Sequence, residues 1–159
     1  MIVRVVCVGR PGRLLGPGIR EYEERAARYW KLEMDEVSPG RGGTGPAGAS
    51  AVMEDEAKGI LRKVGEEATV VALTRSAKGM TSAGLARYLE RRTVASAPEV
   101  AFVVGGAHGL APSVLERAQR SLSLSPMTLP HDLARLVLVE QLFRAGTILR
   151  GEPYHKGRP

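Results

Sequence analysis

The residues that could carry chemistry gather between Val100 and His131, in the stretch VAFVVGGAHGLAPSVLERAQRSLSLSPMTLPH. It opens with a five-residue apolar run, which predicts a strand buried on both faces. The run breaks at Gly105-Gly106, and glycines lack the Cβ atoms that would keep a ligand away from the backbone. A helix and an extended segment at 121–129 follow. A strand, a glycine turn, a helix and a further strand are typical of a ligand site at the carboxyl end of a sheet.

Several kinds of catalysis are excluded by side chains that this stretch lacks. It has no GxSxG elbow for a serine nucleophile, and no Asp or Glu lies between Glu99 and Glu116 to form a carboxylate pair. The histidines His108, His131 and His155 stand far apart without HxH, HExxH or CxxC spacing, so we expect no metal. Glycines, hydroxyls and backbone groups suit a ligand that brings its own reactive group, and they do not suit hydrolysis.

A second glycine-rich segment, residues 38–48, spells the dinucleotide-binding pattern GxGxxG at Gly40, Gly42 and Gly45. In that motif the third glycine lies inside a helix, but here Pro46 follows it directly. The acidic residues further along the chain precede a predicted strand, whereas a ribose-binding acid should end one. We therefore interpret this segment as a flexible loop and not as a nucleotide site.

The composition predicts one globular domain, residues 1–159, in which 43% of the residues are apolar. No apolar run reaches the roughly 18–20 residues that a membrane span requires. The N-terminus has no signal-peptide layout, because Arg4 breaks its apolar run. The single cysteine, Cys7, is expected to be a small core residue. We therefore expect a cytoplasmic location and no membrane partner.

The charge of the chain favours a polyanionic partner, because the net charge is +6 and the pI is about 9.9. Residues 4–31 carry a balance of +4 and residues 144–159 a balance of +3, whereas residues 32–67 carry −4. Aromatic residues make up 4% of the chain, too few for a platform on which bases stack. A merely solubilising surface is the alternative to nucleic-acid binding.

The elements that must position these residues alternate between strand and helix along the chain. This order predicts an α/β fold with a mainly parallel sheet and helices on both of its faces. The strands are expected at 2–8, 32–37, 69–74, 100–104 and 121–129, and the helices at 19–31, 50–64, 81–92, from 112 onward and at 132–150. The last helix is apolar on more than one side, which indicates that it packs against a second subunit as well as the core.

Several motifs along the chain match a known family. They are the VVxVGR start at 5–10, EYEERAARY at 21–29, TVVALT at 69–74, FVVGGAHGL at 102–110, SLSLSPMTLPH at 121–131, ARLVLVEQLFRA at 134–145 and GEPYHK at 151–156. On these residues the sequence resembles the ribosomal large subunit methyltransferase H family of the SPOUT superfamily. The resemblance implies methylation of N3 of pseudouridine 1915 in 23S rRNA by a knotted α/β enzyme.

The resemblance also implies a cofactor, S-adenosylmethionine, in a pocket made by three loops of a C-terminal trefoil knot. In this chain those loops contain Leu73, Gly105 and the segment 124–129. The last of these consists of Leu124, Ser125, Pro126, Met127, Thr128 and Leu129. The family acts as a homodimer, and Tyr154 and His155 of one subunit are expected to complete the substrate site of the other.

For the reaction itself, we expect His131 or His155 to handle the N3 proton or contact the base. Arg135, together with Arg144 and the basic tail, is expected to hold rRNA phosphate. The alternative for His131 is an ordinary residue at a helix N-terminus, and for His155 an ordinary tail residue. His108 is more simply explained as a turn residue.

The chain departs from the family where an acidic residue usually follows Leu73, because here Thr74-Arg75 stands in that place. The 38–48 loop is also rich in glycine where relatives are charged, and Gly157-Arg158-Pro159 extends the tail. Two alternative functions stay open: a SPOUT methyltransferase acting on another RNA such as tRNA, and a ribosome-associated RNA-binding protein without catalytic activity.

Overall fold

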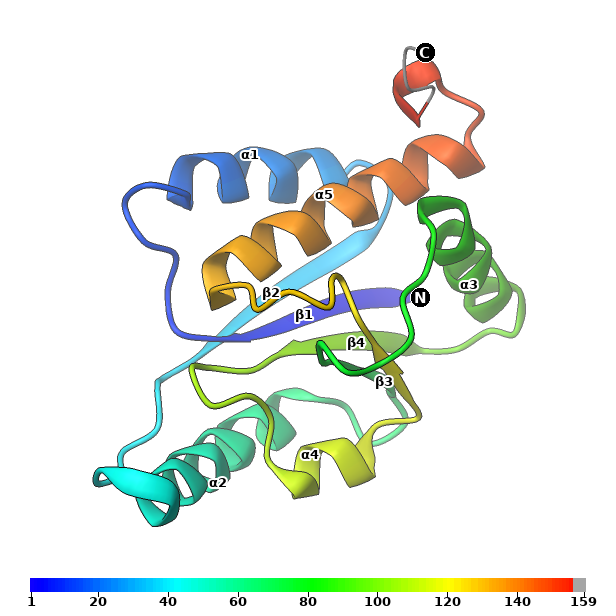
Figure 1. Ribbon diagram of the computed structural model, residues 1–159. Helices are drawn as coiled ribbons and strands as arrows, with labels where there is room; N and C mark the ends of the chain where they lie inside the picture. Colours follow the sequence, from blue (N-terminus) through cyan, green and yellow to red (C-terminus); the bar gives the residue numbers. More distant parts are fainter. Residues whose placement is uncertain (156–159) are drawn as a thin grey trace.

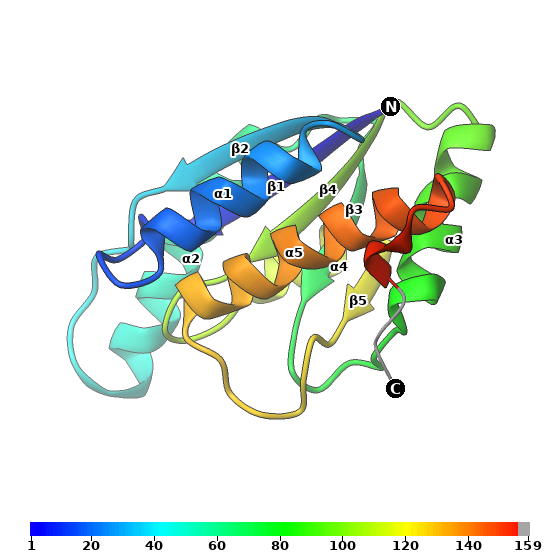
Figure 2. The same cartoon turned by 90° about the horizontal axis from the view of Figure 1, so that it is seen from above.

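A computed structural model of the chain describes residues 1–155, with the backbone alone for His155. Five strands form one sheet in which every neighbouring pair is parallel, in the order β2-β1-β4-β3-β5. They are β1 (Ile2–Val8), β2 (Lys31–Val37), β3 (Thr69–Leu73), β4 (Glu99–Val104) and β5 (Arg120–Leu122). Because all five strands run the same way, their carboxyl ends lie at one edge of the sheet (Figure 2).

Helices cover both faces of this sheet (Figure 1). The helices α1, α3 and α5 pack on one face, and α2 and α4 pack on the other. Their bounds are α1 (Gly16–Ala26), α2 (Gly45–Lys63), α3 (Ser82–Val94), α4 (Pro112–Arg117) and α5 (His131–Leu149), and a 3-10 turn, η1, covers Pro153–His155. The predicted α/β fold with a parallel sheet between helices is therefore confirmed.

The two faces of the central strands build two separate cores. On β1, Val5 faces the core beneath α3 and α5, whereas Val6 faces the core beneath α2 and α4. All six residues of β4 are buried, as expected for a parallel strand covered on both faces. Phe102 lies at its centre, in register with Val5 on one side and Val71 on the other, and it has no exposed surface.

Helix α1 begins and ends earlier than the predicted 19–31. It starts at Gly16, with a proline in its first turn, and stops at Ala26. The ring of Tyr29 lies where a Cβ on Gly146 would be, and the Trp30 indole N–H donates to the carbonyl of Leu142 at 2.8 Å. Both aromatic residues are thus held against α5, and the chain then enters β2 without a further helical turn.

The boundaries of two other segments also differ from those predicted. Helix α2 begins at Gly45 and not at Ser50, because Pro46 fits the first helical turn, where its missing N–H is no loss. The extended segment predicted at 121–129 forms a strand only over Arg120–Leu122, and its remainder is a loop. Helix α3 is capped by Thr81, since its hydroxyl accepts from the Gly84 N–H at 3.0 Å.

Cys7 lies in the core, as the sequence predicted. Cys7 has 1% of its surface exposed, and burial raises the pKa of its thiol to about 12. Among residues 1–155, no helix is long and apolar enough to cross a bilayer.

An ion network joins β1, β2 and β4 on the α2 side of the sheet. The Arg4 guanidinium contacts the carboxylates of Glu33, Asp35 and Glu99, and the Lys63 ammonium lies 3.1 Å from Asp35. Burial alone would raise the pKa of Asp35, but the hydrogen bonds from Lys63 and Arg4 outweigh it and lower that pKa. The ionised form of Asp35 therefore stabilises the folded chain.

We predict that Asp35→Asn lowers the free energy of unfolding at pH 7 by about 1–3 kcal/mol, because it removes charge-assisted hydrogen bonds. The folded pKa is lowered, so the contribution is complete above the unfolded pKa of about 3.9 and disappears as pH falls through the folded value. Urea titrations at several pH values should show wild type and variant converging below about pH 4. The exposed Glu54→Gln serves as control, and an equal loss of stability there would contradict the assignment.

Candidate active site

A cavity of about 720 Å³ opens at the carboxyl ends of β3 and β4. Three loops enclose it, and they follow β3, β4 and β5 in turn. The first turn of α5 closes its remaining side, with His131 and Ala134 at the wall. The helix after β3 packs on one face of the sheet and the helix after β4 on the other, and such a divergence opens a crevice where ligands bind.

The loop after β4 forms the backbone wall of the cavity. A Cβ on Gly105 would lie 2.7 Å from the carbonyl oxygen of Gly109, so this position accepts no side chain without displacing backbone. A Cβ on Gly106 would lie 2.8 Å from a carboxylate oxygen of Glu56, a residue of α2 with 3% of its surface exposed. The glycine turn therefore rests on a buried carboxylate of α2.

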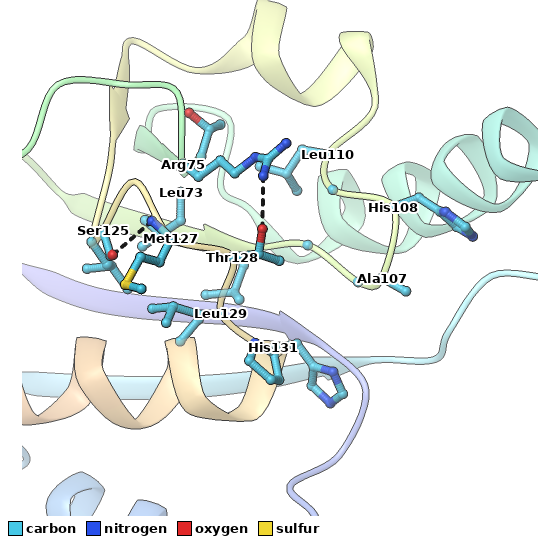
Figure 3. Close-up of a pocket in the computed structure, with 18 of the residues that line it drawn as sticks. Leu73, Arg75, Ala107, His108, Leu110, Ser125, Met127, Thr128, Leu129 and His131 are labelled. Atoms are coloured by element: carbon cyan, nitrogen blue, oxygen red, sulfur yellow. Dashed lines mark hydrogen bonds between the residues drawn. The ribbon is translucent and has the colours of Figure 1, made fainter. Parts of the chain in front are cut away.

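The loop after β5 lies beside the loop after β3. The Ser123 N–H donates to the carbonyl of Lys78 at 3.3 Å, and the Ser123 hydroxyl donates to the carbonyl of Arg75 at 3.2 Å. The Arg75 guanidinium donates to the Thr128 hydroxyl at 2.9 Å, which joins the two loops across the cavity (Figure 3). Within the second loop, the Met127 N–H donates to the Ser125 hydroxyl at 3.0 Å.

The structure brings together most of the residues that were expected to bind a cofactor. Seven of the eight line the cavity: Leu73, Gly105, Leu124, Ser125, Met127, Thr128 and Leu129. Pro126 belongs to the same loop without lining the cavity, and it is exposed. The aliphatic side chains, the glycine backbone and the few hydroxyls form a wall that suits a ligand with both an apolar body and polar groups.

His131 lies at the border of this cavity, as the first residue of α5. Its Nε2 is 3.1 Å from the position that a Cβ on Gly9 would take, so the ring packs against the loop after β1. The neighbouring Asp132 accepts the Gly12 N–H at 3.3 Å and fixes the same loop. Of the catalytic candidates whose side chains the structure describes, which are His131, Arg135 and Tyr154, His131 lines the cavity.

Arg135 lies one turn further along α5 and points away from the cavity. Its side chain is 6% exposed, and its guanidinium contacts Glu23 at 2.6 Å and Glu36 at 2.9 Å. Burial alone would lower the pKa of Arg135, but the hydrogen bonds to Glu36 and Glu23 raise it. The structure thus gives this arginine two carboxylate partners, which link α5 to α1 and β2.

Tyr154 lies at the far end of α5, outside the cavity of its own chain. Its hydroxyl is 3.2 Å from that of Tyr22 and donates to Glu140 at 3.1 Å, and its ring packs on Phe143 with centroids 4.5 Å apart. Burial raises the pKa of Tyr154, and so do the hydrogen bonds that its hydroxyl makes with Tyr22 and Glu140. The side chain of His155 and residues 156–159 lie outside the described residues.

Sequence reasoning missed part of the cavity wall. Arg75 lines it, as does the exposed His108, which was explained as a turn residue and whose ring points away from Arg75 and Thr128 (Figure 3). Gly106, which belongs to the predicted glycine turn, lines it as well. The signal that could have found Arg75 is its position directly after a buried strand, at the edge where Gly105 also lies. No three His, Cys, Asp or Glu side chains within residues 1–155 are placed as a metal ion would require.

The GxGxxG segment does not contribute to the cavity. Gly40 donates its N–H to Glu56 at 3.0 Å, and a Cβ there would lie 2.3 Å from the carbonyl oxygen of Val52. Gly40 and Gly42 therefore allow the 38–44 loop to pack closely on α2, whereas Gly45 is the first residue of that helix.

Comparisons with known proteins agree with this arrangement. A family model described as "Predicted SPOUT methyltransferase" matches residues 1–155. Proteins named ribosomal RNA large subunit methyltransferase H are similar over the whole chain. The relative from Gemmatimonas aurantiaca is 50% identical and that from Anaeromyxobacter sp. strain Fw109-5 is 48% identical, and each match covers 98% of this chain and 100% of the relative.

The fold also resembles a solved structure of a probable methyltransferase from Bordetella pertussis Tohama I, with a TM-score of 0.53 and 17% identity over 91% of this chain and 93% of that one. The chain belongs to the SPOUT methyltransferases and, within them, to the ribosomal RNA large subunit methyltransferase H family. It is a methyltransferase, and the family resemblance predicted from its motifs is confirmed.

We predict that Arg135→Met destabilises the fold by roughly 2–3 kcal/mol, because it leaves Glu23 and Glu36 facing each other without a cation. The loss of stability is smaller than for a fully buried pair, since Glu36 is partly exposed. Chemical denaturation measures this change. The exposed Arg62→Gln is the control and should stay within about 0.5 kcal/mol of wild type.

Proposed function

We propose that the chain methylates N3 of pseudouridine 1915 in 23S rRNA, with S-adenosylmethionine as methyl donor. The observation that carries this proposal is the cavity at the carboxyl ends of β3 and β4, whose wall combines a glycine turn with the 124–129 loop. The names of the relatives support ribosomal RNA as the substrate. We further propose that residues 1–159 act as one domain and that the enzyme works in the cytoplasm.

The residues of the cavity fit this cofactor. A volume of about 720 Å³ accommodates a drug-sized molecule, for which pockets of about 300–1,000 Å³ are usual. Gly105 lines the cavity without a side chain, and Leu73, Leu124 and Leu129 offer aliphatic surface to a planar base. S-adenosylmethionine supplies a methyl group on a sulfonium, which is already activated for transfer.

The chain itself then has three tasks in the reaction. The cavity wall must hold the donor with its methyl group in line with N3 and keep water away from it. A side chain must accept the N3 proton or contact the base, and His131 at the cavity border is one candidate for this task. His155 of the partner subunit is the second candidate.

We propose that the C-terminal part of the chain forms a trefoil knot. The bridge between Gly79 and Ser123 supports it, since the loop after β5 runs alongside the loop after β3. The chain then turns back across the sheet, and α5 packs between α1 and α3 (Figure 2). This path is consistent with a chain that passes through a loop of its own backbone, an arrangement that is rare in proteins.

We propose a homodimer in which the tail of each subunit completes the site of the other. Tyr154 supports this arrangement, because it lies outside the cavity of its own chain and is held in place by Tyr22 and Glu140.

The cofactor proposal is tested by calorimetry with S-adenosylmethionine. We predict that Gly105→Val abolishes measurable binding, because its side chain must displace the Gly109 backbone. The control is Gly43→Val, since a Cβ at Gly43 meets nothing within 4 Å. Absence of binding to the wild type, or equal binding by the Gly105 variant, would contradict the proposed function.

The role of the tail is tested by methyl transfer to large ribosomal subunits that lack the modification. We predict that His155→Ala lowers kcat by about 10²-fold or more if this side chain handles the N3 proton, with unchanged affinity for S-adenosylmethionine. Activity equal to wild type would remove His155 from the site. Mass spectrometry of 23S rRNA from a deletion strain identifies the modified nucleotide and separates this target from tRNA.

A further inference from the structure

The five loops that follow the carboxyl ends of the strands share a charge pattern. These carboxyl-edge loops are residues 9–15, 38–44, 74–81, 105–111 and 123–130. They contain five of the chain's 23 basic residues and none of its 17 acidic residues. The remaining 18 basic and 17 acidic residues nearly cancel, so these loops account for five of the six net positive charges.

The five basic side chains of these loops are all exposed to solvent, and they are Arg10, Arg13, Arg41, Arg75 and Lys78. Arg10 has 90% of its side chain exposed and lies 3.7 Å from Glu36. Among residues 1–155, the other four have no carboxylate within ion-pair distance. Their charge is therefore directed to solvent and not neutralised inside the fold.

The carboxylates that border this edge are engaged by other groups. Asp132 accepts backbone N–H groups of Gly12 and Leu133, at 3.3 and 3.1 Å. Asp55 accepts the backbone N–H of Arg41 at 3.2 Å, and Glu36 binds the buried Arg135. These contacts fix the loops in place. The three carboxylates keep their charge, but the five basic side chains of the loops outnumber them.

The opposite edge of the sheet has no such excess of basic residues in its loops. Its loops at 27–30, 64–68, 95–98 and 118–119 hold Arg28 against Glu66 and Glu67. The charge of the inter-element loops is therefore asymmetric along the strand direction, and the basic loops are those on the side of the cavity. A basic surface of this kind attracts polyanions.

The basic residues also adjoin the cavity itself. Arg75 lines it and is held over its mouth by Thr128. Arg10 directly follows Gly9, against which the ring of His131 packs. Arg41 lies in the neighbouring loop after β2, which meets the loop after β1 around a smaller hollow of about 280 Å³. The charges are spread over three loops rather than gathered in one pocket, which suits an extended backbone of phosphates better than one small anion.

We propose that the carboxyl-edge loops form the surface on which the RNA strand lies, with Arg10, Arg13, Arg41, Arg75 and Lys78 contacting phosphates on both sides of the cavity. This inference rests on the proposed function and adds the path of the RNA backbone to it. Arg75 lines the cavity, so within this surface it would contact the phosphate nearest the reacting base.

The test compares two double variants that remove the same charge. Arg10→Gln with Arg13→Gln removes two arginines from the proposed surface, and Arg62→Gln with Arg91→Gln removes two exposed arginines elsewhere. Filter binding measures the affinity of each for a transcribed 23S rRNA fragment between about 0.05 and 0.2 M salt, a range chosen because phosphate contacts show as salt dependence. Methyl transfer to large ribosomal subunits gives KM and kcat, and calorimetry gives the affinity for S-adenosylmethionine.

We expect the Arg10 and Arg13 variant to raise KM roughly tenfold with little change in kcat or cofactor affinity. Its salt slope should fall by about 0.7 to 0.9 for each phosphate that is no longer bound, and Arg41→Gln should show about half of this effect. The control pair should stay within about twofold of wild type.

The proposed surface would be overturned if the two double variants changed KM and rRNA affinity equally. It would also be overturned if the Arg10→Gln, Arg13→Gln variant kept the wild-type dependence of affinity on salt. An effect with ribosomes but none with the rRNA fragment would assign the edge to a ribosomal protein and overturn it as well. The binding measurement needs no catalysis, so a failure of methyl transfer or of cofactor binding in the wild type counts against the proposed function alone.

Discussion

The common direction of the five strands is the constraint on which the rest of the molecule depends. A parallel ladder sends every strand end to the same edge, so the segments after β1, β2, β3, β4 and β5 meet there although they are far apart in sequence. Each connection must then cross the sheet as a helix, and the helices bury the apolar residues of both faces. The cavity, its glycine turn and the basic side chains around it all follow from this geometry.

The fold was predictable because its apolar runs are short and clearly separated. Val100 to Val104 could only be a doubly buried strand, and Pro112 marked the start of α4. Most of the cavity wall was also predictable, but from motif resemblance and not from periodicity. The helix boundaries that tertiary contacts decide were not predictable. Helix α1 ends before Tyr29 and Trp30 because their rings pack on α5, and no local pattern encodes that contact.

The surroundings of the charged residues were harder to predict than the fold. Arg135 and Arg75 have the same side chain, yet one is enclosed by Glu23 and Glu36 and the other lies over the cavity mouth. Arg135 lies on the side of α5 that meets α1 and β2, whereas Arg75 lies in the loop after β3, and only the packed structure shows which carboxylates each of them meets. Glu56 is a similar case, because a carboxylate on an ordinary helix becomes the support of the Gly106 backbone only when the 38–44 loop has folded over α2.

The position of α5 between α1 and α3 has a consequence for how the protein is made. Leu138 and Leu142 have no exposed surface, and they fill the core that α1 and α3 leave open. During synthesis this helix leaves the ribosomal exit tunnel after the five strands and the other four α-helices, so the nascent chain exposes an unfinished apolar core until α5 has emerged. A stop codon that removes α5 would therefore yield not a shortened enzyme but an aggregation-prone chain that chaperones and proteases remove.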